Sequence, residues 1–148
     1  VEPVNLRKLM KTLLLLINLL AISEFSFSIG GNDTLNEVTC NQVEIRHGRL
    51  YGDWHYVINS EKEFRKIIGG RSGIDFSAFT LLGVVTSSGG CQPPEVSHSV
   101  KYSKQSDEYF YELKVKVNGL CEPNHLIEIW CTIAKISDSS TVAFSKQE

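Results

Sequence analysis

The sequence has no long apolar segment and no strong excess of charge of either sign. Its main apolar run, residues 13–22, is ten residues long and contains Asn18, whereas a helix that crosses a bilayer needs about 20 apolar residues. Fifteen basic residues against 17 acidic ones give a net charge of −2, with the two signs interspersed. Because no basic patch is visible, nucleic acid is not an expected partner, and no stable membrane span is expected once an N-terminal signal is removed.

Short motifs for metal binding and catalysis are also missing. Structural zinc sites use paired ligands such as Cys-x2–4-Cys and His-x3–5-His, and neither spacing occurs among the four cysteines and four histidines. The nucleophile-elbow pattern G-x-S-x-G and the phosphate-binding pattern G-x4-G-K-[ST] are absent too. The sequence therefore predicts no catalytic residue, metal or cofactor. A small secreted hydrolase that pairs Ser87 or Ser88 with His98 or another histidine is an alternative.

The N-terminal segment has the features of a secretion signal. Three basic residues precede the apolar run of residues 13–22, and small residues follow at Ser26 and Ser28, the positions that a signal peptidase reads. Removing residues 1–28 takes away three basic and two acidic residues, so the net charge changes from −2 to −3. The predicted location is exported, meaning periplasmic, cell-surface or extracellular.

The predicted domain organisation follows from this signal. Residues 1–28 are predicted to be an N-terminal extension plus the signal, and residues 29–36, rich in Gly and Asn, a flexible mature N-terminus. Residues 37–148 are long enough for one domain with a single core and too short for two ordinary ones. Whether the apolar segment is cleaved or retained stays open.

Four cysteines, Cys40, Cys91, Cys121 and Cys131, all follow the predicted signal. An even number in an exported chain predicts two disulfides. If residues 126–134 form a strand, Cys131 lies on the order of 20 Å from His125 along the strand direction. A bridge from Cys131 to Cys121 would therefore require the chain to fold back. Cys91–Cys121 with Cys40–Cys131 is the favoured pairing, and Cys40–Cys121 with Cys91–Cys131 remains the alternative.

Alternating apolar and polar residues predict a mostly β domain. The alternation is clearest over residues 109–117, and the continuous apolar run at residues 79–86 is typical of a strand buried on both faces. The other predicted strands are residues 38–46, 51–58, 96–102, 126–134 and 141–145. The fold class is α+β and mostly β: one antiparallel sheet or sandwich-like domain with a single short helix, stapled by disulfides.

One helix is predicted at residues 60–68. Ser60 followed by Glu63 makes a capping box, and Phe64, Ile67 and Ile68 fall on one face at helical spacing. An amphipathic helix must cover an apolar surface, so we expect this one to pack on the sheet and bury Trp130.

One order of motifs resembles a known family. Glu63-Phe64, the segment Ile74-Asp75-Phe76-Ser77, the apolar residues 80–85 and the Thr/Ser/Gly-rich residues 86–91 follow one another as in the PrcB C-terminal-type domain. The resemblance covers roughly half of the chain. It implies a β-rich extracytoplasmic domain without catalytic residues. Since the founding member belongs to a surface protease complex, it also implies a role in stabilising, assembling or inhibiting a protease.

The predicted function is that of an exported, non-enzymatic protein-interaction domain whose partner is a protease or another envelope protein. A structural cell-envelope protein, self-associating through an edge strand such as residues 141–145, is an alternative. A loop anchored by a disulfide binds with little loss of ordering entropy. The predicted contact loop consists of Thr86, Ser87, Ser88, Gly89, Gly90, Pro93 and Pro94.

Overall fold

Strands predominate in the computed structural model, which describes residues 34–45, 52–122 and 124–148. The elements are β1 (Leu35–Val38), β2 (Asn41–Gln42), β3 (Trp54–Ile58), α2 (Glu61–Ile67), β4 (Phe79–Ser88), β5 (Gln92–Ser103), β6 (Glu108–Asn118), β7 (His125–Ala134) and β8 (Thr141–Gln147). The predicted signal segment lies outside the described residues, as does Tyr51 of the second predicted strand. Within the described residues, the mostly β fold with one short helix is confirmed.

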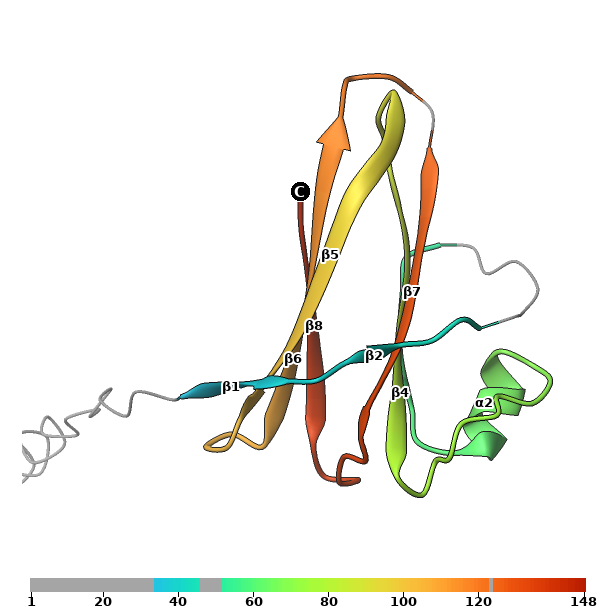
Figure 1. The fold of residues 1–148 in the computed structure, drawn as a ribbon, viewed down its shortest axis with the longest axis vertical. Helices are drawn as coiled ribbons and strands as arrows, with labels where there is room; N and C mark the ends of the chain where they lie inside the picture. The colour runs from blue at the N-terminus through green and yellow to red at the C-terminus, as the bar shows by residue number, and fades with distance from the viewer. Residues whose placement is uncertain (1–33, 46–51, 123) are drawn as a thin grey trace, which may run out of the picture. The chain divides into compact units, whose positions relative to one another are not determined.

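The strands form two four-stranded sheets, ordered β1-β5-β6-β8 and β2-β7-β4-β3, and Figure 1 shows β5, β6 and β8 beside β7 and β4. The pairs are antiparallel except β6 with β8, which is parallel. The prediction that every late strand is antiparallel is therefore wrong for residues 141–145. After β7 the chain crosses from one sheet to the other, so no hairpin forces the antiparallel direction.

Strand β4 is buried on both faces, as its apolar run predicted. Leu82 and Val84 face an inner cluster between the two sheets, whereas Leu81 and Val85 face an outer cluster beneath the helix. This alternation follows from the two-residue period of a strand. The buried members of the inner cluster are Leu82, Val84, Val100, Tyr111, Leu113, Val115, Ile127, Ile129, Cys131, Ile133 and Ile136.

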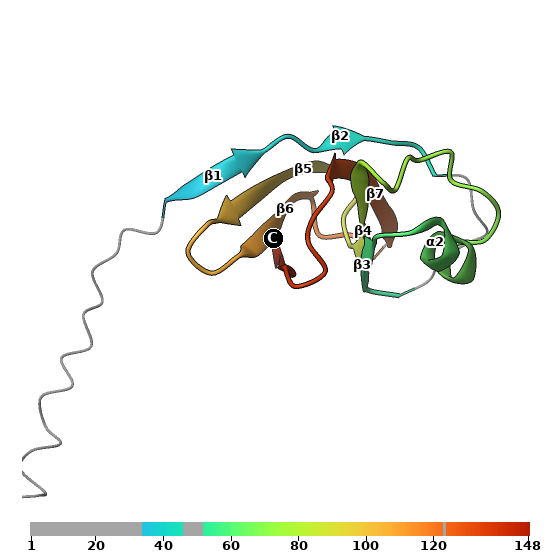
Figure 2. The same cartoon turned by 90° about the horizontal axis from the view of Figure 1, so that it is seen from below.

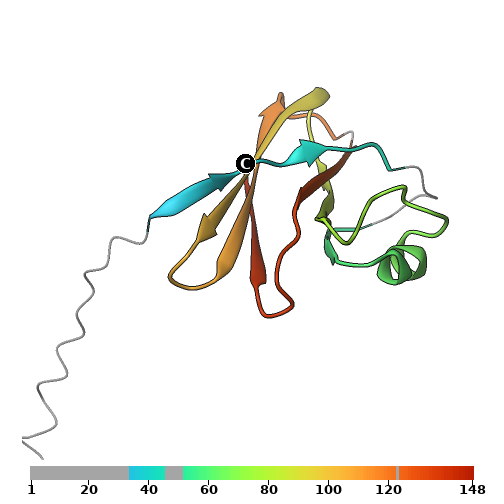
Figure 3. The ribbon, with the colours of Figure 1, turned by 60° about the horizontal axis from the view of Figure 1, so that its bottom comes forward.

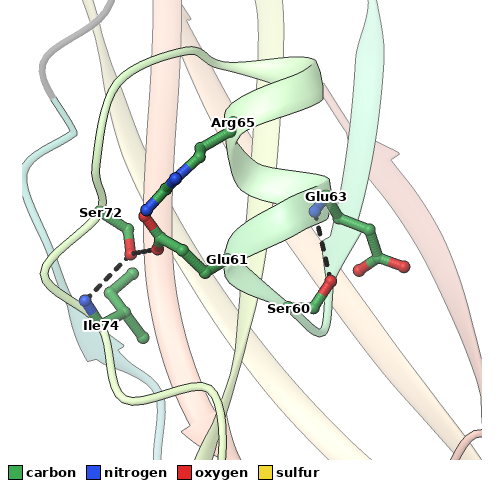
Figure 4. A network of polar contacts seen from close by, with 6 residues as sticks. All are labelled: Ser60, Glu61, Glu63, Arg65, Ser72 and Ile74. Carbon is green, nitrogen blue, oxygen red and sulfur yellow. Dashed lines mark hydrogen bonds and ion pairs between the residues drawn. The ribbon is translucent and has the colours of Figure 1, made fainter.

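Helix α2 begins at the predicted cap and lies on the side of the β2-β7-β4-β3 sheet away from the other sheet (Figure 3). The Ser60 hydroxyl accepts from the Glu63 amide at 3.2 Å (Figure 4). The Glu63 carboxylate accepts from the Asn59 amide at 2.8 Å, one residue before the position that a standard capping box uses. The helix ends just before Gly69, whose φ of +89° suits glycine.

The helix covers Trp130, as predicted. Buried Phe64 and Trp130 share the outer cluster, and Tyr56 stacks on the indole with ring centroids 5.3 Å apart. A Cβ atom at Gly83 would lie 2.1 Å from the indole ring, so only glycine leaves room for it. The prediction is wrong for Ile67, which is 40% exposed. The helix is short, and Phe64 and Ile68 alone make its contact with the outer cluster.

Strands β1 and β2 follow one path that runs across both sheets (Figure 2). β1 pairs with β5, and β2 pairs with β7 in the other sheet. Of the predicted strand at residues 38–46, Val38 ends β1 and Asn41–Gln42 form β2. Residues 39–40 and 43–45 lie in no strand, and Arg46 lies outside the described residues. Leu35 and Asn36, predicted to belong to a flexible segment, lie in β1.

Among the helices in the described part of the chain, none is long and apolar enough to cross a membrane.

Candidate functional site

Both disulfides have the favoured pairing. Cys40 is bonded to Cys131 with Cα atoms 5.5 Å apart, and Cys91 to Cys121 with Cα atoms 4.7 Å apart. All four cysteines of the chain are therefore paired. The alternative pairing is excluded, because each cysteine already has its partner.

The Cys91–Cys121 disulfide joins two turns at one end of the sheets. We call residues 89–91 and 118–122 the clamped end, where the β4–β5 and β6–β7 connections meet at the top of Figure 1. Backbone hydrogen bonds run from Cys91 N–H to Asn118 O at 2.8 Å and from Gly90 N–H to Cys121 O at 3.3 Å. His125 Nε2 donates to Gly90 O at 3.1 Å. The two turns are thus held to each other by one covalent bond and two hydrogen bonds, and His125 at the start of β7 adds a third hydrogen bond to Gly90.

Apolar side chains are exposed to solvent at the clamped end and in the strand ends beside it. Leu120 is fully exposed, at 104% of its reference area. Leu126, at the start of β7 beside this end, is 57% exposed, and Val117 is also exposed. Leu120 alone lies on the turn, whereas Val117 and Leu126 lie in the strand ends that flank it. Exposed apolar side chains that gather in this way are typical of a binding surface. In the sequence, Leu120 stands between Asn118-Gly119, a pair typical of turns, and Cys121. This is the signal that sequence reasoning missed.

The predicted contact loop is mostly not a loop. Thr86, Ser87 and Ser88 are the last residues of β4, and Thr86 and Ser88 are only 3% and 4% exposed. Gly90 is buried, and Pro93 and Pro94 lie in β5, where the pairing with β6 shifts register. Thr86 and Ser88 extend the strand because their small side chains fit buried positions where each hydroxyl donates a hydrogen bond. Only Gly89 and Pro93 of the predicted set are exposed.

The hydroxyl of Thr86 supports a neighbouring strand end. It donates to Asp53 Oδ1 at 2.5 Å, and this hydrogen bond lowers the pKa of Asp53 below its ordinary value, with a further lowering by nearby Lys146. Lys146 in turn donates to the carbonyl of Ser87 at 3.0 Å. These contacts tie the open edges of the two sheets together.

A groove of about 170 Å³ lies between these edges, with His55 and Phe144 among its lining residues. The two rings stack with centroids 4.7 Å apart. Ligand pockets usually measure about 300–1,000 Å³, so this groove is too small to be the principal site of a drug-sized ligand.

The serines and histidines named for the hydrolase alternative are partly brought together. Ser88 is paired with His125 across β4 and β7. However, Ser88 Oγ donates to the Gly89 carbonyl at 3.2 Å, and the His125 ring is bonded to the Gly90 carbonyl. Both side chains therefore support the turn in this structure.

His98 lies in β5, within the predicted strand at residues 96–102, and is half-buried. Its ring stacks on Tyr111 with centroids 5.6 Å apart. Burial lowers the pKa of His98 below its ordinary value.

Comparisons with protein-family models, with curated proteins and with solved structures give no match for this chain. The class of protein is therefore defined by the structure itself: a β domain of two sheets, stapled by two disulfides and covered on one outer face by a helix.

Proposed function

We propose that this chain is an exported, non-enzymatic protein-interaction domain whose contact surface is the clamped end. The observation that carries the proposal is the full exposure of Leu120 in a turn held by Cys91–Cys121. Of the predicted loop, the clamped end keeps exposed Gly89, and it adds Leu120. Exposed Pro93 and Leu126 flank it in β5 and β7.

A rigid turn favours binding for a physical reason. Association costs free energy for every segment that must be ordered, about 0.5–1.5 kcal/mol for each immobilised side chain with many rotamers. The disulfide and the hydrogen bonds of the clamped end order its backbone before a partner arrives. An apolar side chain on such a turn can then fill a partner's pocket, as interface anchors do.

The partner that we propose is a surface protease or another envelope protein. The resemblance of residues 63–91 to the PrcB C-terminal-type domain supports a protease. Two disulfides support an oxidising compartment, where such bonds form and persist.

Site-specific photo-cross-linking in the native producer tests the contact surface. A photoreactive amino acid at position 120 is expected to give a discrete cross-linked product. The matched control is position 35, another exposed leucine, which pairs with Ser103 at the opposite end of β5. Equal products from both positions, or none from position 120, would contradict the proposed surface.

The intact mass of the protein purified from its native envelope or medium tests the export proposal separately. A mass that begins at Ile29, with four thiols blocked until reduction, is the expected result. A full-length mass with four free thiols would remove the case for export.

The structural-envelope alternative has one observation in its favour, since β8 is an edge strand of its sheet. Edge strands present unpaired backbone groups that can pair with another chain. Sedimentation of the purified protein distinguishes the two functions: reversible self-association that a proline at Ala143 removes would favour the structural role.

A further inference from the structure

We propose that Cys40, Cys131 and His98 form a redox-gated metal site, closed while the two sulfurs are bonded and open to a thiophilic cation such as Zn²⁺ after reduction. The site is independent of the proposed contact surface. It lies where the chain crosses between the sheets, away from the clamped end.

The three residues come from three separate places in the sequence. Cys40 lies between β1 and β2, His98 in β5 and Cys131 in β7. β1 and β5 pair as Val38 with Val100, so continuing that antiparallel register by two residues brings Cys40 opposite His98. The disulfide then joins Cys40 to Cys131 on the other sheet. The sequence contains no short zinc motif because these ligands are gathered by the sheets and not by a chelating loop.

The distances suit a metal ion. The two sulfur atoms and one imidazole nitrogen lie within 4.8 Å of one another. With Zn–S of about 2.3 Å and Zn–N of about 2.0 Å, a tetrahedral site separates its ligand atoms by about 3.5–3.8 Å. Once the sulfurs are no longer bonded, side-chain rotation alone can approach this geometry. Three protein ligands would leave a fourth position for water or a substrate.

His98 carries the second, independent observation. Within the described residues its Nδ1 atom is buried and has no hydrogen-bond partner. A buried polar atom without a partner costs about 1–3 kcal/mol, so such an atom calls for an explanation. A metal ion bound through Nδ1 would give this atom the partner that it lacks.

The gating step is a thiol–disulfide exchange. A dithiol reductant becomes a disulfide and supplies two electrons and two protons, which break the Cys40–Cys131 bond and leave two thiols. Zn²⁺ then binds the two thiolates and the imidazole and displaces two protons to solvent. An oxidant that restores the disulfide removes both thiolates and releases the ion. Of the two bonded cysteines, Cys40 is partly exposed and Cys131 is buried, so the exchange is expected to begin at Cys40.

The second disulfide is a matched control, because among the described residues only the Cys40 group brings three such ligands together. The test uses the full chain as C91A/C121A, reduced by a phosphine and titrated with Co²⁺, whose thiolate complexes give a charge-transfer band. We expect saturation at one Co²⁺ per chain. We expect no such band from C40A/C131A treated in the same way.

His98→Phe and His98→Asn, each in the C91A/C121A background, separate a metal site from two unstructured thiols. In both variants the affinity for Co²⁺ should fall by more than about tenfold relative to C91A/C121A, since even partners outside the coordination sphere contribute about 10–100-fold. Circular dichroism of the oxidised variants checks their fold, and the Asn variant stands in if the Phe variant does not fold. The proposal is overturned if C91A/C121A gives no band or if C40A/C131A binds Co²⁺ as tightly as C91A/C121A does. It is also overturned if both His98 variants keep the affinity of C91A/C121A.

Discussion

The Cys40–Cys131 bridge and the Cys91–Cys121 bridge lie in contrasting surroundings. Cys131 is fully buried in the inner cluster, and Cys40 is only partly exposed. Cys91 and Cys121 are both exposed at the clamped end. The first bridge joins residues 91 apart and ties the β1–β2 path to the opposite sheet, while the second joins residues 30 apart. The comparison indicates that one disulfide chiefly stabilises the fold and the other chiefly fixes the shape of a surface.

The largest expected effect comes from removing the bridges one at a time. The loop-closure model assigns about 4.6 kcal/mol to a 91-residue loop and about 3.6 kcal/mol to a 30-residue loop. C40A/C131A also leaves a cavity in the inner cluster, so its loss of unfolding free energy should exceed that of C91A/C121A. Urea unfolding of both variants measures the difference. A larger loss of unfolding free energy in C91A/C121A would contradict the view that the Cys40–Cys131 bridge is the main stabiliser of the fold.

The rates of reduction should differ in the opposite sense. Thiol–disulfide exchange requires access to a sulfur, and Cys91 and Cys121 are the more exposed pair. With a limiting dithiol, we expect alkylation and peptide mapping to find Cys91 and Cys121 modified before Cys40 and Cys131. Simultaneous modification of all four cysteines would show that global unfolding controls both bridges.

His98 adds a pH dependence to the Cys40–Cys131 region. Its pKa is lowered in the folded state, so the unfolded chain binds more protons below the ordinary value of about 6.5. The contribution to stability is fully present above that pH and is lost as the pH falls through 6.5 toward the folded pKa. Urea unfolding from pH 7.5 to 5 should show this loss in the wild type. His98→Asn should have a flatter profile, and an identical slope would contradict the assignment.

The smallest effect on stability is expected at Leu120. Because its side chain is fully exposed, Leu120→Asp should change the free energy of unfolding by less than about 0.5 kcal/mol. The same variant should abolish partner binding if the clamped end is the contact surface. Thermal unfolding, measured beside a pull-down of the partner, separates the effect on stability from the effect on binding. A large loss of stability would mean that Leu120 packs in solution.

The sequence predicted the elements whose signals are local. The Ser60–Glu63 cap, the strand buried on both faces at residues 79–86 and the burial of Trp130 all depend on short-range pattern and on simple packing. The strand at residues 126–134 also argued against a Cys121–Cys131 bridge, and the structure contains the favoured one of the two pairings that remained.

Features that depend on tertiary register were not predicted. The parallel direction of β8 arises from a crossing between sheets that local pattern does not encode. Thr86 and Ser88 were assigned to a loop because serine and glycine are common in turns, whereas pairing with β7 keeps them in the strand. Likewise, the proximity of His98 to Cys40 and Cys131 requires the register of β1 on β5 and the disulfide together.

The most direct test of the central claim is photo-cross-linking from position 120 in the wild type and in C91A/C121A, with circular dichroism of both proteins. If the Cys91–Cys121 bridge presents the contact surface, the cross-linked product should be strong in the wild type. It should fall sharply in the variant, while the β-sheet spectrum is retained. An equal yield from both proteins would contradict the claim, because the surface would then bind its partner without the clamp.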